Sequence, residues 1–177
     1  MIRGLAGNSV LAFTIGHSGF SNKLISKVSV SPHDNANTSG IVTTQEPSLN
    51  GLWDTGATCS VITQNVVDSL SLKPIRYGFV STPSGEYETS FYYVDIGLPN
   101  HVIVGPLLVP LGKPSGCDVL IGMDVIMSGD FAVSNYNGST TFTFRVPSIE
   151  TTDYVKKARI SSLLGPKHGK GKKNKKQ

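Results

Sequence analysis

The chain has 177 residues with 38% hydrophobic content, which suits one compact domain with tails, because two cores of typical domain size would need a longer chain. The net charge of +4 is unevenly distributed: residues 1–155 hold seven Lys and Arg against twelve Asp and Glu, a net −5, whereas residues 156–177 hold nine basic residues and no acid. No stretch approaches the roughly 20 apolar residues of a membrane span, which excludes a transmembrane helix.

The first third of the chain has the pattern of short strands. Runs of Val, Ile, Thr and Tyr, together with 19 Gly and 10 Pro, favour a mainly β chain with many turns. Residues 9–15 and 24–31 are predicted strands, and the second alternates apolar with polar residues as a half-buried strand should. Residues 32–48 indicate a long loop, or a hairpin with a weak second strand. After residue 63 a short helix is predicted, with Thr63 as its N-cap.

A hairpin follows the predicted helix. Its extended arms, Tyr77–Ser81 and Tyr87–Ile96, flank a turn at Thr82-Pro83-Ser84-Gly85, where Pro followed by Gly is typical of a turn. Residues 101–111 then supply two apolar strand pieces, which we expect to be broken at Gly105-Pro106.

The last part of the body alternates short strands with one helical turn. Residues 117–122 predict a short buried strand, and residues 123–129 predict a turn or two of helix. Residues 131–135 and 140–146 then form a predicted hairpin.

The stretch from Leu52 to Thr63, LWDTGATCSVIT, places Asp54 between a buried strand and a run of small residues. The tripeptide Asp-Thr-Gly alone is weak evidence for a catalytic aspartate, because the same residues also close ordinary type I turns. Further features make it specific: a second alternating strand follows through Ile62, and the apolar-Gly segment Val119–Gly122 recurs about 65 residues later.

These motifs resemble those of the retropepsin-like aspartic peptidases. Their residues are closer to those of bacterial or retroelement members than to those of the retroviral enzymes. The resemblance covers roughly residues 24–146: the DTGAT-x-S-x-I block, a flap-like hairpin, and Val-Leu-Ile-Gly-Met-Asp before a short helix. It implies an all-β fold, a small closed acid-protease-type barrel with psi-shaped core loops, a flap hairpin and one or two short helices. We accordingly expect an N-terminal extension at 1–22, the protease-like domain at 23–148, and a basic, disordered tail at 149–177.

The same resemblance implies that each lobe supplies one aspartate. Peptide hydrolysis by a bound water needs one ionised and one protonated carboxyl group, and two adjacent carboxyls share a proton. The chain holds no second Asp-[Ser/Thr]-Gly, since Asp118, Asp124 and Asp130 have other neighbours. The second Asp54 would therefore come from another copy, in a homodimer that cleaves a peptide or protein substrate.

The resemblance also implies roles for neighbouring residues. Thr55 would hydrogen-bond across the twofold axis, Gly56 would let the backbone approach the carboxylates, and Ala57 would stay small beside substrate. The hairpin tip at Ser84 and Gly85 would close over substrate. The apolar pockets that bind substrate side chains would be lined by Ile62, Val80 and Val109.

Two features depart from the family pattern. Trp53 is bulkier than the aliphatic residue usual before the aspartate, and the hairpin tip is poorer in Gly than retroviral flaps. The retroviral enzymes also build the dimer's sheet from chain termini, whereas here the chain runs on into the basic tail, so the seam could be built differently.

Other site chemistries have less support. The four histidines (His17, His33, His101 and His168) lack partners at ligand spacing and are expected at the surface, so neither a metal nor a cofactor is predicted. Cys59 and Cys117 lie far apart, and reduced thiols in a cytoplasmic protein are the simpler interpretation than a bridge. The apolar run near the N-terminus is too short for a signal peptide.

Two alternatives to a protease remain open at this point. The same barrel could serve as a non-catalytic dimeric peptide-binding module. The basic tail could be a solvated solubilising segment, or it could make a weak contact with nucleic acid or another anionic surface.

Overall fold

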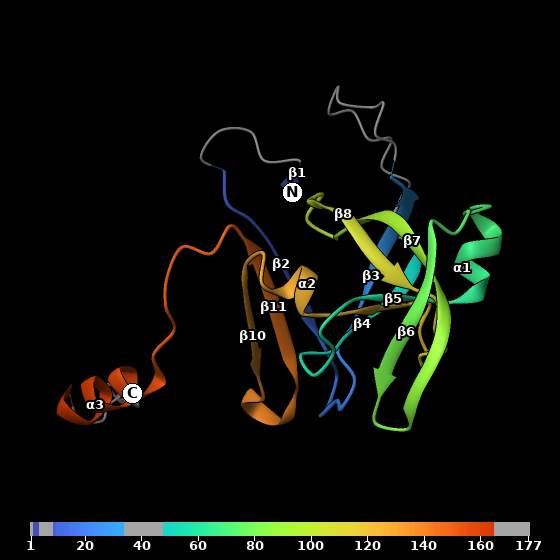
Figure 1. The fold of residues 1–177 in the computed structure, drawn as a ribbon. Coiled ribbons are helices and arrows are strands. Elements are labelled where there is room, and N and C mark those ends of the chain that lie inside the picture. The colour runs from blue at the N-terminus through green and yellow to red at the C-terminus, as the bar shows by residue number, and fades with distance from the viewer. Residues whose placement is uncertain (1, 4–8, 34–47, 165–177) are drawn as a thin grey trace, which may run out of the picture.

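The computed structural model describes residues 2–3, 9–33 and 48–164, which form a mainly β protein (Figure 1). Its strands are β1 (Ile2–Arg3), β2 (Leu11–Gly16), β3 (Ile25–Pro32), β4 (Leu49–Trp53), β5 (Val61–Ile62), β6 (Arg76–Thr82), β7 (Gly85–Gly97), β8 (Ile103–Pro110), β9 (Val119–Ile121), β10 (Asp130–Ser134) and β11 (Thr141–Val146). Its helices are α1 (Gln64–Ser69), α2 (Met123–Ile126), the 3₁₀ helix η1 (Tyr136–Gly138) and α3 (Tyr154–Leu164). The predicted strands at 9–15 and 24–31, the flap-like hairpin and the helix after Thr63 are confirmed, while the weak strand within 34–47 lies outside the described residues.

The larger sheet curls into a small barrel. Its strands follow the order β1-β8-β7-β3-β4-β9-β5, with β6 paired to β7. The last strand of this path, β5, returns to the chain just after β8, where Ile62 forms a parallel bridge with Leu111. The side chain of Ile62 is completely buried by this closure.

The centre of the barrel has the psi arrangement that the family resemblance implies. Strand β9 pairs in parallel with β4 and antiparallel with β5, so it lies between them. The loop that joins β4 to β5 therefore passes around the end of β9, and this loop carries Asp54.

A second sheet has three strands in the order β10-β11-β2, all antiparallel (Figure 1). Strand β2 alternates half-buried with exposed residues, and its apolar side chains pack on the core. This differs from the expectation of an extension at 1–22, because β2 pairs with β11 as a strand of this second sheet and the structured unit thus begins before residue 23.

An aromatic cluster joins the two sheets. The Trp53 ring stacks on Phe131 of β10 with 5.4 Å between ring centroids and an interplanar angle of 4°, and it also meets Phe13, Phe142 and Phe144. The indole Nε1 donates to Ser26 Oγ at 2.9 Å, which satisfies its one polar group. A bulky residue before Asp54 is thus explained by the space between the sheets.

The expected break at Gly105-Pro106 is wrong, since β8 runs through both residues. Val94 of β7 pairs with Leu107, and Ile96 pairs with Val104, so the two β8 residues lie opposite the single residue Asp95. At such a bulge the missing N–H of proline leaves no ladder bond unmade.

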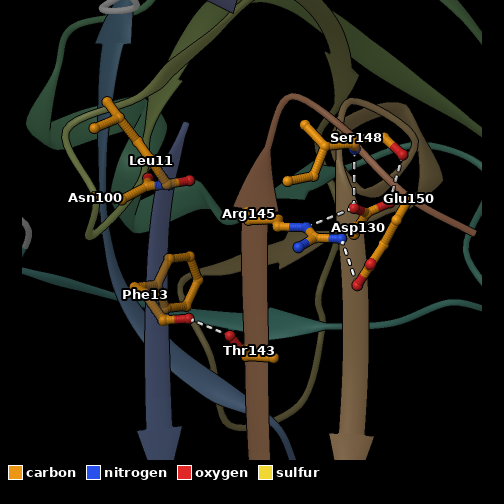
Figure 2. Close-up of polar contacts among 9 residues, drawn as sticks. Leu11, Phe13, Asn100, Asp130, Thr143, Arg145, Ser148 and Glu150 are labelled. Carbon is orange, nitrogen blue, oxygen red and sulfur yellow. Dashed lines mark hydrogen bonds and ion pairs between the residues drawn. The ribbon is translucent and has the colours of Figure 1, made fainter. Parts of the chain in front are cut away.

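The segment after β11 is fastened to the second sheet before it leaves the domain. Asp130 of β10 accepts hydrogen bonds from Arg145 Nε at 2.6 Å, Ser148 Oγ at 2.5 Å and the Ile149 amide at 3.2 Å (Figure 2). Arg145 also contacts Glu150 at 3.2 Å.

Helix α3 then forms within the tail that was expected to be disordered. Its first turn begins at Asp153, whose carboxylate accepts from the Lys156 amide at 3.0 Å, so a local cap explains why this part is helical. The side chains described along α3 are exposed. Within the part of the chain that the structure describes, no helix is long and apolar enough to cross a membrane.

Candidate active site

Asp54 lies directly after β4, at the centre of the psi arrangement. Its backbone amide donates to the Ile121 carbonyl of β9 at 2.9 Å, and the amide of Trp53 donates to Leu24 at 2.9 Å. The backbone on both sides of the carboxylate is therefore held by neighbouring strands, and the half-buried side chain projects from a rigid edge.

The loop folds back on the carboxylate that it carries. Gly56 N–H donates to Asp54 Oδ1 at 2.8 Å, and the Ala57 amide donates to the Asp54 carbonyl at 3.2 Å. A Cβ at Gly56 would lie 3.2 Å from Asp54 Oδ1, so glycine leaves room for the close approach. Thr55 and Gly56 are exposed, so this surface of the loop is open to another molecule.

A buried polar network holds the far end of the loop. Both carboxylate oxygens of Asp124, in α2, accept from the Ser60 amide at 2.9 and 3.0 Å, and Oδ1 also accepts from Ser60 Oγ at 2.7 Å. Ser60 Oγ in turn accepts from the Gly122 amide at 3.0 Å. The pattern of Asp-Thr-Gly did not find Asp124, although its place two residues after the apolar-Gly segment was the available signal.

The glycine of the apolar-Gly segment has a steric role. A Cβ at Gly122 would lie 2.4 Å from the Cys59 carbonyl carbon and 2.6 Å from its oxygen. Only a residue without a side chain lets β9 pass this close to the loop.

The flap hairpin extends from the barrel beside a cavity. Residue pairing from Arg76↔Phe91 to Thr82↔Gly85 defines the hairpin, and Gly85 at its tip has a φ of 119°, which favours glycine. Thr89 Oγ1 ties the hairpin base to the barrel through the Leu111 carbonyl at 2.8 Å. A cavity of about 600 Å³ is lined by Gln64, Thr82, Ser84, Tyr87, Glu88, Thr89, Leu111, Gly112 and Lys113.

The residues predicted to bind substrate differ in their exposure. Ser84 and Gly85 are exposed at the hairpin tip, while Ala57 and Val80 are half-buried. Val109 is completely buried in the core, so it does not line an open surface in this structure. Its partner on β7, Tyr92, is buried as well, so both side chains lie on the core face of this strand pair. Asp54 is not among the residues that line the cavity beside the flap.

The two cysteines are free and poorly suited to act as nucleophiles. Burial, and secondly the Asp124 carboxylate, raise the pKa of the Cys59 thiol. Burial also raises the pKa of Cys117. Because the thiolate is the reactive form, both shifts disfavour a cysteine mechanism.

The expectation that the histidines lie at the surface is wrong for His33. Its side chain is 9% exposed, and Nδ1 lies 3.0 Å from Asp95 Oδ1 of β7. The ring of His17 stacks near Phe142, whereas His101 is exposed as expected and His168 lies outside the described residues. Among the described residues no group of three His, Cys, Asp or Glu side chains could hold a metal ion.

Comparison with known proteins finds similarity to solved structures. Neither a protein-family model nor a curated protein sequence matches the chain. A retropepsin-like aspartic protease from Rickettsia conorii matches with 12% identity and a TM-score of 0.46, over 80% of this chain and 98% of that one. The EIAV protease in complex with an inhibitor matches with 19% identity and a TM-score of 0.39, over 59% and 86% of the two chains.

A third match is the Simian Foamy Virus (mac) protease, with 19% identity and a TM-score of 0.32, over 43% of this chain and 77% of that one. All three matched structures are proteases. At these identities the likeness concerns the fold alone.

Proposed function

We propose that this chain is an aspartic endopeptidase that works as a homodimer, with one Asp54 from each copy. The observation that carries the proposal is the Asp54 loop itself. It holds a carboxylate on a rigid edge, bonded to Gly56 N–H, with Thr55 and Gly56 exposed beside it. A loop built in this way can meet an identical loop across a twofold axis.

The chemistry needs both carboxyl groups. Two Asp54 side chains held together share one proton, because both cannot ionise cheaply at short range. The ionised carboxylate removes a proton from water, whose oxygen attacks the peptide carbonyl carbon, while the protonated one donates its proton to the carbonyl oxygen. The tetrahedral intermediate then collapses: the C–N bond breaks, and the departing amine takes the proton that the first carboxyl group removed from water. A hydroxyl of the intermediate returns a proton to the second carboxylate, which leaves a new carboxylic acid and restores the shared proton.

Other parts of the chain would support this reaction. Thr55 would bond across the axis to the second copy, and the Asp124–Ser60 network would keep the loop in register. The flap, with Ser84 and Gly85 at its tip, would cover an extended peptide and keep water away from the reacting bond. Ala57 and Val80 are the proposed contacts with substrate on the described surface.

Substitution of Asp54 by Asn tests the proposal. The change keeps the shape of the side chain but removes its charge and its ability to share a proton. Wild type and Asp54→Asn would be incubated at high concentration with a denatured protein between about pH 4 and 7, since a weak dimer dissociates on dilution. Fragments would be identified by mass spectrometry, and light scattering would report the size of both proteins.

We expect cleavage by the wild type and at least a thousandfold loss in Asp54→Asn with the dimer intact, roughly 4 kcal/mol of transition-state stabilisation. A folded wild-type dimer that cleaves nothing would contradict the proposal and favour a peptide-binding module. Equal cleavage by both proteins would contradict any role for Asp54 in the reaction.

A further inference from the structure

Strand β10 lies at an uncovered edge of the three-stranded sheet. In the order β10-β11-β2, β10 pairs only with β11 among the described residues (Figure 1). Exposed strand edges carry unpaired amide and carbonyl groups and readily pair with another chain, so proteins usually cover or break them. Here the edge contains neither a proline nor a lysine.

The register shows which backbone groups face this edge. The His17 amide donates to the Thr140 carbonyl at 2.8 Å, so the backbone of Thr140 points toward β2. Successive residues of a strand point alternately to its two sides. Thr143 therefore points toward β10, and its partner Ala132 points back toward β11. Consequently the N–H and C=O groups of Phe131 and Val133 point outward, to the free edge.

The same edge is apolar on the core side and connected to Asp54. Phe131 stacks flat on Trp53, the residue that precedes Asp54, at 5.4 Å. Val133 shares the face of Phe131, because their partners on β11 are the buried Phe142 and Phe144. Yet Val133 is 40% exposed, so an apolar side chain remains open where the sheet ends.

We propose that β10 pairs antiparallel with β10 of a second copy of this chain, and that this seam positions the two Asp54 loops. The proposal rests on the homodimeric protease described above and specifies where its copies meet. Pairing joins the two three-stranded sheets into one, and the Trp53–Phe131 stack connects that sheet to each Asp54.

Charge and side-chain size favour a register centred on Ala132. In that register Ala132 lies on the twofold axis, and Phe131 and Val133 exchange backbone hydrogen bonds with their partners. Each Asp130 then lies opposite Ser134 of the other copy, so the two acids do not face each other. The small Ala132 side chain lets the strands approach at the axis.

A proline at Val133 tests the seam. Val133→Pro removes an N–H that points outward but leaves Ala132 and Ser134, which face β11, unchanged. Val133→Thr is the matched control, since it keeps the N–H and the β-branched shape. Sedimentation over a concentration series measures the dimer, and circular dichroism checks the fold.

We expect the dimer dissociation constant to rise about tenfold or more in Val133→Pro, through the loss of one seam bond from each copy, and to change little in Val133→Thr. A Val133→Pro protein that dimerises like the wild type would overturn the seam. So would a wild type that stays monomeric at every concentration.

A cross-link tests the register without relying on proline. Directly opposed residues in a non-hydrogen-bonded pair have Cα atoms about 4.5 Å apart, within the range that a disulfide spans. Ala132→Cys should therefore give a disulfide-linked dimer under mild oxidation. Ser134→Cys is the control, because its copies would lie about 13 Å apart along the strands.

Peptide mass mapping identifies the 132–132 bridge and separates it from bridges of Cys59 or Cys117. A dimer that Ala132→Cys does not cross-link, or that Ser134→Cys cross-links equally, would overturn the proposed register. Cleavage is a separate measurement: a cross-linked dimer with no protease activity supports the seam while contradicting the proposed reaction.

Discussion

At the residue scale, the site separates two acids with different tasks. Asp54 projects from the psi loop beside the exposed Thr55 and Gly56, where a second carboxylate can approach. Asp124 lies at the far end of the loop, where its carboxylate accepts hydrogen bonds from Ser60 and from the Val125 amide. Both oxygens of Asp124 accept hydrogen bonds within the chain, whereas Asp54 Oδ1 accepts one from Gly56 N–H, so the Asp54 carboxylate is the one available to another molecule.

The Asp124 network should be required for stability. In Asp124→Ala, the buried amide and hydroxyl of Ser60 lose their acceptor, and each unsatisfied group costs about 1–3 kcal/mol. We expect the free energy of unfolding to fall by about 2–4 kcal/mol in urea titrations. Asp68→Ala, which removes only an exposed contact to Gln64, serves as control and should change it by less than about 0.5 kcal/mol. Equal effects of the two substitutions would contradict this role.

At the scale of elements, Asp130 fastens the chain after β11 to the start of β10 (Figure 2). Hydrogen bonds from Ser148 and then from Arg145 hold the pKa of Asp130 below its usual range. A carboxyl with a lowered folded-state pKa stabilises the protein above its unfolded pKa, and this contribution is lost as pH falls through the folded pKa.

Stability measured against pH should reveal this fastening. The wild type should be more stable than Asp130→Asn above about pH 5, and the difference should shrink below about pH 4, where the unfolded carboxyl binds its proton. Urea titrations of both proteins from pH 3 to 7 measure it. The pair is about a quarter exposed on each side chain, so added salt should reduce the difference. A difference independent of pH would show that the charge of Asp130 is not involved.

At the scale of the whole molecule, charge is segregated along the chain. The body through residue 155 carries net −5, whereas α3 and the residues beyond it hold nine basic residues and no acid. The described side chains of α3 are exposed, so the helix adds little to the core. The contact of this tail with an anionic surface remains a prediction.

Deleting residues 154–177 should show that the tail contributes to binding of an anionic partner and not to the stability of the fold. We expect the thermal midpoint to shift by no more than about 2 °C, while binding to a single-stranded oligonucleotide at low salt is lost. Fluorescence anisotropy across a salt series measures the binding, and for the full chain log K should fall linearly with log salt. A tail that only solubilises the protein would leave both proteins equally unable to bind.

The sequence by itself determined the features that depend on neighbouring residues. Alternation defined strands such as Ile25–Pro32, and the Pro-Ser-Gly turn placed the flap-like hairpin. Each of these patterns is written within about ten consecutive residues, because backbone geometry and side-chain periodicity act locally.

Only the tertiary structure decided which distant residues meet. Asp124 and Ser60 are 64 positions apart, and His33 and Asp95 are 62 apart, so no local pattern pairs them. The burial of Val109 and the place of β2 beside β11 likewise depend on which faces of the two sheets pack together. Close packing and the need to satisfy buried polar groups act between elements, and they are resolved only when the barrel closes.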